Sequence, residues 1–269
     1  MNVKRLDTIP EEIFSITGSR EYTESHTGMS GSKVLLFPEH VLKLGPHTEE
    51  TDNAAAAAEW LRGKVRVPRL LLYRTEDGIA YTLRERVKGI MLCDISFLMR
   101  PEKLAEMTAE AILSLWRVDI SDCPLRVSRL SERLKAARRN VEEGLVDIEN
   151  TEPDTFGPHG FADPEALLYW LEKNRPEEDP VMTHGDLSLP NLFAEGDEFS
   201  GFIDLGKAGP ADRWQDVAIA LRSLRKNIGG EYGDGVPFGR FEPRMLLEPL
   251  GLRPDPEKER YYMLLDELF

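Results

Sequence analysis

The stretch Thr183-His-Gly-Asp-Leu-Ser-Leu-Pro-Asn191 is followed by Gly201-Phe-Ile-Asp-Leu-Gly206. An aspartate with an asparagine five residues later, and then an apolar strand that ends in Asp-x-Gly, is typical of sites that transfer phosphoryl groups. A short loop can present Asp186 to an acceptor hydroxyl and turn Asn191 toward Mg²⁺, and Asp204 can supply a second oxygen ligand. The His-Gly-Asp triplet alone would fit a turn with a structural histidine equally well. The three parts in this order favour a phosphoryl-transfer site.

The part of the chain before this stretch should supply a lysine for the phosphates. Lys43 lies in the predicted strand His40–Leu44, where a lysine ordinarily extends from an edge into solvent. Kinases hold such a lysine with a helix carboxylate. Glu59 is the only acid beyond the start of the alanine-rich helix predicted over 52–62, which Asp52 can cap. The small-residue loop Thr27–Ser32 can bring backbone N–H groups close to phosphate.

Patterning predicts an α+β chain in two parts. Four short apolar runs and one helix make residues 20–88 a small sheet lobe, with strands at Lys33–Phe37, His40–Leu44, Arg69–Tyr73 and Ala80–Arg86. The rest is mostly helical, with apolar residues at helical spacing over Glu102–Val118, Arg129–Leu145, Asp163–Leu171, Asp212–Leu224 and Glu257–Phe269. Residues 144–163 predict a long loop. We therefore expect a domain boundary between residues 88 and 89.

Composition bounds the class of protein. The 269 residues are 41% hydrophobic and 30% charged, which suits a globular protein with a real core. No apolar run is long enough to span a membrane and no secretory signal opens the chain, so we expect a cytoplasmic protein. The two cysteines, Cys93 and Cys123, are interpreted as reduced thiols.

The net charge is unevenly distributed. Residues 1–89 carry 13 basic and 13 acidic residues, so the whole net charge of −14 belongs to residues 90–269. This charge disfavours nucleic acid or an anionic membrane as the main partner. It fits either a solvated acidic surface or an attraction for a cationic ligand.

These motifs resemble those of the aminoglycoside 3'-phosphotransferase family, within the wider bilobal protein-kinase-like fold. The matching residues span nearly the whole chain: Gly28-Met-Ser30, Lys43, Glu59, His184-Gly-Asp186, Leu189-Pro-Asn191, Gly201–Gly206, Ala211–Asp216 and Leu265-Asp-Glu-Leu-Phe269. The resemblance implies a nucleotide-binding lobe over 1–88 and a catalytic and aminoglycoside-binding lobe over 89–269. It also implies transfer of the γ-phosphate of ATP or GTP to a drug hydroxyl, most simply the 3'-hydroxyl, which confers antibiotic resistance.

The resemblance assigns roles to single residues. The implied nucleotide contacts are Ser30, Lys43 aligned by Glu59, and the backbone from Glu85 to Val87 against the base. Asp186 would act as catalytic base or positioning carboxylate, and Asn191 and Asp204 would hold Mg²⁺. His184 and Asp216 would brace the loop by hydrogen bonds. The implied substrate contacts are Glu152, Asp154, Arg222, Asp266, Glu267 and Phe269.

Some departures leave the specificity open. Lys226 and Ser223 stand where relatives often place acids, and a lysine would repel an ammonium group. Val41 stands where some relatives carry an aromatic residue that stacks on the base, so the choice between ATP and GTP stays open. Two alternatives remain: a kinase for another small alcohol, which only the pocket acids would distinguish, and a non-catalytic nucleotide-binding module. We expect a monomer or weak dimer.

Overall fold

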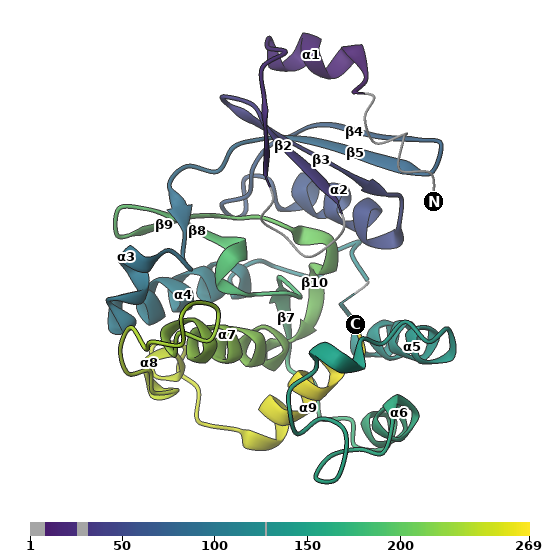
Figure 1. The fold of residues 1–269 in the computed structure, drawn as a ribbon, viewed down its shortest axis with the longest axis vertical. Helices are drawn as coiled ribbons and strands as arrows, with labels where there is room; N and C mark the ends of the chain where they lie inside the picture. The colour runs from purple at the N-terminus through teal and green to yellow at the C-terminus, as the bar shows by residue number, and fades with distance from the viewer. Residues whose placement is uncertain (1–8, 26–31, 127) are drawn as a thin grey trace.

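The computed structural model describes residues 9–25, 32–126 and 128–269, so Ser30 lies outside the described residues. The chain forms a two-lobed α+β fold, with a sheet lobe above a mostly helical lobe (Figure 1). The sheet is antiparallel, with the strand order β1-β2-β3-β5-β4. Its strands are β1 (Thr23–Ser25), β2 (Lys33–Leu36), β3 (His40–Pro46), β4 (Leu70–Glu76) and β5 (Ile79–Glu85).

The two faces of this sheet have different roles because successive strand residues point to opposite sides. On one face Leu42 and Leu83 join an apolar cluster with Ile13, which belongs to a helix that the sequence did not predict. On the other face lie Lys43 and its register partner Thr82. The helices flanking the sheet are α1 (Glu11–Thr17) and α2 (Glu49–Leu61). The lysine side of the sheet thus faces α2 and the cleft between the lobes.

Helix α2 begins three residues earlier than predicted. Thr48, not Asp52, is its N-cap: the Thr48 hydroxyl accepts a hydrogen bond from the Thr51 backbone N–H, and the Thr51 hydroxyl accepts one from Thr48 N–H. Asp52 instead accepts a 2.7 Å hydrogen bond from the Tyr73 hydroxyl and pairs with His47. The earlier start adds Glu49, Glu50 and Thr51 to the helix.

The helical lobe is packed around one long buried helix, α7 (Arg213–Ile228), of which Val217, Leu221 and Leu224 are fully buried. The other helices are α3 (Ile95–Leu98), α4 (Pro101–Trp116), α5 (Leu130–Glu142), α6 (Pro164–Lys173), α8 (Arg244–Leu247) and α9 (Pro256–Asp266). The long predicted helices are thereby confirmed to within a few residues. The predicted loop over 144–163 contains only one 3-10 turn, Ile148–Asn150.

Short strands carry the motif residues of this lobe. Strand β7 (Pro180–Thr183) pairs with β10 (Gly209–Asp212), and β8 (Leu192–Glu195) forms a hairpin with β9 (Glu198–Phe202). Strand β6 (Ile90–Met91) pairs with β8, so the chain joins the helical lobe directly after the link at 86–89. The hairpin register places Asn191, just before β8, beside Ile203, just after β9.

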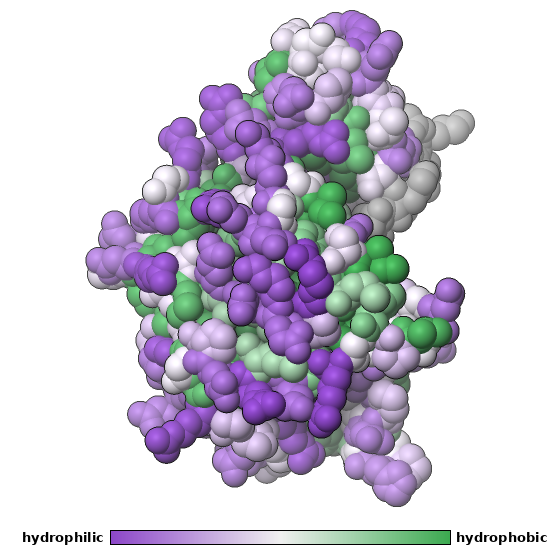
Figure 2. Space-filling view, turned by 90° about the vertical axis from the view of Figure 1, so that its left-hand side faces the viewer, coloured by the Kyte–Doolittle hydropathy of each residue, from purple (hydrophilic) through white to green (hydrophobic). Residues whose placement is uncertain are grey.

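The surface is mainly hydrophilic on the face shown in Figure 2, where hydrophobic side chains form small groups among polar ones. Within residues 9–25, 32–126 and 128–269, the helices are all too short or too polar to cross a lipid bilayer.

Candidate active site

The loop that follows β7 is fixed from below by a buried carboxylate. Asp216, in the first turn of α7, accepts hydrogen bonds from the backbone N–H groups of His184 (2.7 Å) and Gly185 (2.8 Å). The His184 ring accepts from Asp186 N–H at Nδ1, so its Nε2–H donates to Ile203 O at 2.8 Å. These bonds confirm the bracing role predicted for His184 and Asp216.

The backbone also requires glycine at position 185. Gly185 has φ +84°, and a Cβ atom there would lie 2.0 Å from the backbone oxygen of Lys207. The loop that follows β7 therefore packs directly against the turn Leu205–Lys207, which follows Asp204. This close approach brings the two motifs together.

Asn191 orients Asp186. The Asn191 side-chain Nδ2 donates to the backbone oxygen of Asp186 at 2.9 Å and to its carboxylate Oδ2 at 3.1 Å. Within the described part of the chain the Asn191 Oδ1 accepts no hydrogen bond, so a neutral oxygen ligand is left free beside the Asp186 carboxylate.

Asp204 links the two lobes through Lys43. It has φ +57°, an uncommon conformation for a residue other than glycine. Lys43 Nζ donates to its Oδ1 at 3.1 Å. Burial alone would raise the pKa of Asp204, but the charges of Lys43 and Arg84 outweigh it and hold the pKa below its usual value. Asp204 is thus ionised at neutral pH, as a metal ligand must be.

The predicted pairing of Lys43 with Glu59 is wrong. Glu59 pairs with Arg62 at 3.6 Å on its own helix, and half of its side chain is exposed. Glu50, Ala54 and Ala58 line the cavity. Glu59 lies about 100° further round the helix than Ala58, because a helix has 3.6 residues per turn. The acid of α2 that reaches the cleft is Glu50, which the late predicted start of the helix concealed.

A cavity of about 390 Å³ between the lobes joins these residues. It is lined by Lys43 and Arg84 from the sheet, by Glu50 from α2, and by Asp186 and Asp204 from the helical lobe. Side chains that are far apart in the sequence therefore meet at one site.

The predicted base contacts lie outside this cavity. Glu85 and Val87 line a separate groove with Arg66 and Lys88, and Glu85 pairs with Arg69 at 2.8 Å. Glu85 N–H already donates to Arg69 O, whereas Val87 N–H makes no hydrogen bond among the described residues. Contact of this segment with a base therefore stays a prediction.

The predicted substrate residues meet around Arg222 of α7. Arg222 pairs with Asp266, and with Glu267 at 3.5 Å. The second oxygen of Glu267 accepts from Glu152 N–H at 3.1 Å. Lys226 binds Glu152 at 2.5 Å, so this lysine neutralises an acid of the cluster. Asp154 differs from them: it is exposed and forms no ion pair within the described residues.

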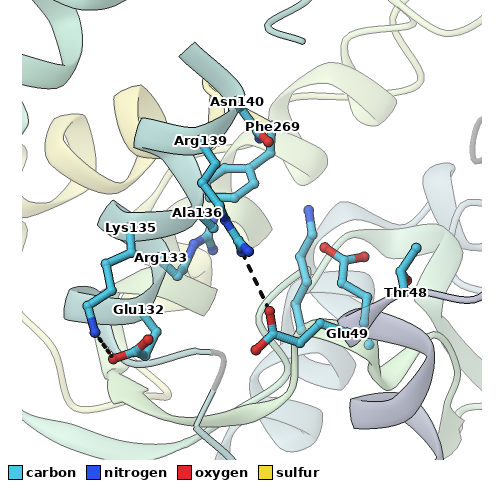
Figure 3. Close-up of a pocket in the computed structure, with 12 residues that line it drawn as sticks. Thr48, Glu49, Glu132, Arg133, Lys135, Ala136, Arg139, Asn140 and Phe269 are labelled. Carbon is cyan, nitrogen blue, oxygen red and sulfur yellow. Dashed lines mark hydrogen bonds and ion pairs between the residues drawn. The ribbon is translucent and has the colours of Figure 1, made fainter. Parts of the chain in front are cut away.

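A second pocket, of about 670 Å³, lies beside this cluster (Figure 3). The ring of Phe269 lies against its wall, with the Arg133 guanidinium 4.6 Å and the Lys207 ammonium 5.4 Å from the ring centroid. Arg139 of α5 reaches across to Glu49 of α2 at 3.5 Å. Arg133 and Arg139 line this pocket but were not predicted as site residues, although both belong to the helix predicted over 129–145.

The two pockets are contiguous. Thr48, Glu50, Gly206 and Lys207 line both of them. A phosphate donor in the first pocket and an acceptor in the second would therefore meet along these shared residues, and Asp186 lines the first pocket. This arrangement defines a two-substrate phosphotransferase site between two lobes.

Comparisons with known proteins agree with this geometry. The model of the phosphotransferase enzyme family matches residues 27–247. The chain therefore belongs to the phosphotransferase enzyme family. An aminoglycoside 3'-phosphotransferase of Enterococcus faecalis is 40% identical over 214 residues, which cover 78% of this chain and 75% of that protein.

Solved structures show the same fold over nearly the full length. An aminoglycoside-3'-phosphotransferase of type VIII superposes with a TM-score of 0.74 at 28% identity and covers 93% of each chain. An aminoglycoside phosphotransferase from Streptomyces rimosus, solved with ADP and streptomycin, has a TM-score of 0.74 at 25% identity over 95% of each chain.

The acid stability of the protein should depend on Asp266. Burial would raise its pKa, but Arg222, Lys207 and Arg133 lower it below the unfolded value near 3.8. At a pH between the folded and unfolded pKa values of Asp266, the unfolded chain binds more protons than the folded protein. The stabilisation from Asp266 is therefore complete above the unfolded pKa and is lost as the pH falls through the folded pKa.

Urea unfolding of the wild type and Asp266→Asn from pH 6 to pH 3 measures this loss. We expect the difference in unfolding free energy to shrink below about pH 4. Glu267→Gln is the control, because burial raises the pKa of Glu267. The difference in unfolding free energy between the wild type and Glu267→Gln should therefore change with pH in the opposite direction. A pH-independent difference for Asp266→Asn would contradict the pairing.

Proposed function

We propose that this protein is an aminoglycoside 3'-phosphotransferase, which transfers the γ-phosphoryl group of ATP or GTP to the 3'-hydroxyl of an aminoglycoside and so confers resistance. The observation that carries the proposal is the convergence of Lys43, Asp186 and Asp204 on one cavity, which shares lining residues with a second pocket that both acidic and basic side chains line. In this proposal the chain has two domains: residues 1–88 bind the nucleotide, and residues 89–269 bind the acceptor.

Asp186 acts on the acceptor. Its carboxylate accepts a hydrogen bond from the 3'-hydroxyl, orients that oxygen toward the γ-phosphorus, and takes up the proton as the new O–P bond forms and the bond to the β-phosphate oxygen breaks. Asn191 holds the carboxylate in place through its 3.1 Å hydrogen bond. Positioning accounts for much of the rate, because two reactants held together react as one molecule.

The oxygen donors beside Asp186 suit Mg²⁺. The Asp204 carboxylate and the free Asn191 Oδ1 are hard oxygen ligands, and Mg²⁺ usually takes only one or two carboxylates from the protein and the rest from phosphates and water. Bound there, the ion would neutralise charge on the phosphates.

Lys43 and the proposed phosphate contact Ser30 would bind the nucleotide. Lys43 is paired with Asp204 at 3.1 Å, and it exchanges part of this contact for phosphate oxygens when a nucleotide binds. Glu59 has no part in this step, because its partner is Arg62. Backbone groups of Glu85 and Val87 would contact the base from the interlobe link.

The acceptor pocket binds ammonium groups. We place the drug between the second pocket, which Phe269 lines, and the acids Glu152, Asp154, Asp266 and Glu267, which adjoin that pocket through the 3.6 Å pair of Arg133 with Asp266. Each charge-assisted hydrogen bond contributes about 1.5–3 kcal/mol before other costs. An ammonium group must compete with Arg222 and Lys226 for these acids. We therefore expect a narrower drug spectrum than a cluster of free carboxylates would give.

Kinetics on matched drug pairs test the function. With Mg²⁺ and a mixture of ATP and GTP, kcat/KM for kanamycin or neomycin should exceed that for an otherwise similar drug without the 3'-hydroxyl by more than about 100-fold, since the acceptor atom is missing. Equal turnover of the deoxy drug would contradict the regiochemistry. Turnover of an unrelated alcohol and of no aminoglycoside would favour the alternative of another small-alcohol kinase.

The proposed setting is cytoplasmic, as a monomer or weak dimer, with the nucleotide and the drug as partners rather than nucleic acid or membrane. In this proposal each chain is active on its own. Sedimentation at working concentration, with and without drug, tests this, and activity that disappears on dilution in parallel with a dimer would contradict it.

A further inference from the structure

The side chain of Arg84 lines the proposed nucleotide cavity and is unpaired in the part of the chain that the structure describes. It is at the end of β5, two positions beyond Thr82 and on the same face of the sheet. It lines the cavity together with Lys43 and Asp204. Within residues 9–25, 32–126 and 128–269 its side chain makes no hydrogen bond and no ion pair. A guanidinium carries five N–H donors and no acceptor, so its cavity should bring acceptors with the ligand.

The position of Arg84 along the sheet separates it from the phosphate region. Lys43 pairs in register with Thr82, and Val41 pairs with Arg84. Arg84 is therefore about 7 Å from Lys43 along the strands, toward the link between the lobes. The same link carries Glu85 and Val87, the proposed base contacts. Lys43 lies on the phosphate side of the cavity and Arg84 on the base side.

Arg84 is coupled to the charge of Asp204 without a bond to it. Burial lowers the pKa of the guanidinium, and Asp204 opposes this through space without contact. Asp204 itself is bonded to Lys43 at 3.1 Å. The donors of Arg84 are thus left for an acceptor on the ligand.

The edge of a purine base decides which nucleotide fits. Guanine presents two acceptors, O6 and N7, on one edge, and an arginine fork binds them as a pair, whereas adenine presents the acceptor N7 and the donor N6 amino group. With adenine, an N–H donor of Arg84 would face the N6 amino group, which is also a donor. This inference rests on the proposed function. We propose that Arg84 is a specificity-determining residue that donates to guanine O6 and N7 and makes GTP the preferred phosphate donor.

Three nucleotides and one substitution test the proposal. The wild type should show a kcat/KM for GTP about 5- to 150-fold above that for ATP. ITP, which keeps O6 and N7 but lacks the 2-amino group, should behave like GTP. Arg84→Met, which keeps the length of the side chain without its donors, should lower the values for GTP and ITP toward the value for ATP.

The other outcomes would overturn the proposal. Preference of the wild type for ATP would do so. An equal loss with GTP and ATP in Arg84→Met would assign Arg84 to the phosphates, and an unchanged ratio would assign it to structure. Arg74→Met is the matched control on the same sheet, because Arg74 pairs with Glu76 outside the cavity and its loss should leave the ratio unchanged.

Calorimetric binding of GDP and ADP separates this proposal from the proposed function. If neither nucleotide binds the wild-type protein, the proposed function itself fails. If both bind and Arg84→Met leaves their affinity ratio unchanged, only the assignment of Arg84 fails. We expect the wild type to bind GDP more tightly and the variant to bind the two alike. Thermal unfolding of Arg84→Met shows that the variant is folded.

Discussion

Asp186→Asn is expected to lower kcat by about 10²- to 10⁴-fold, the range in which a positioned acid or base contributes to a reaction. The amide keeps the shape of the side chain, but it carries no negative charge and does not take up the proton of the acceptor hydroxyl. Because Asp186 is only partly buried and Asn191 can still contact it, the KM for both substrates and the stability of the fold should change little.

Steady-state kinetics with a spectroscopic assay for released nucleoside diphosphate measure this effect. Asp197→Asn is the matched control, since Asp197 pairs with Arg100 on the surface, away from the cavity. A decrease of less than tenfold in kcat for Asp186→Asn, with normal folding, would show that another group activates the hydroxyl.

Asp216→Ala is expected to destabilise the protein more than any other substitution of a predicted loop-bracing residue. The carboxylate is fully buried, and burial raises its pKa even though two backbone N–H groups bind it. Its removal leaves the N–H groups of His184 and Gly185 unpaired in the interior. Each unpaired donor costs about 1–3 kcal/mol, so we expect a loss of about 2–6 kcal/mol.

Thermal and urea unfolding measure this loss, and kcat should fall as well because the catalytic loop loses its anchor. Asp216→Asn keeps one acceptor oxygen and should lie between the wild type and the alanine variant. Asp234→Ala, in the exposed loop after α7, is the control and should stay within about 0.5 kcal/mol of the wild type. Unchanged stability of Asp216→Ala would contradict the bracing role.

The sequence was sufficient for the centre of the site because its geometry is local. The spacing from Asp186 to Asn191 and the hairpin from Leu192 to Phe202 bring Asp186, Asn191 and Asp204 together through contacts that are local in the sequence. Lys43, the lysine predicted to bind the phosphates, could be located because it lies in a short apolar strand of the other lobe. The structure agrees with the expected convergence of Lys43, Asp186 and Asp204.

The errors arose where a contact depends on a helix start or on strand register. Thr48 caps α2 before the predicted start, so Glu50 belongs to the helix and lines the cavity, whereas Glu59, nine residues further on, lies on the opposite side of the helix. The position of Arg84 depends on the register of β3 with β5, which the alternating pattern of Ala80–Arg86 does not fix. The ion pair of Lys226 with Glu152 depends on how a loop meets α7, which single-sequence patterns do not encode.

Locating the phosphate on the product tests the central claim most directly. Kanamycin incubated with the enzyme, Mg²⁺ and an equal mixture of GTP and ATP would be isolated, and phosphorus–carbon couplings in its NMR spectrum would show the carbon that bears the phosphate. The site described above predicts a gain of one phosphoryl group, attached at the 3' carbon. Unmodified drug, or a phosphate on any other carbon, would contradict it.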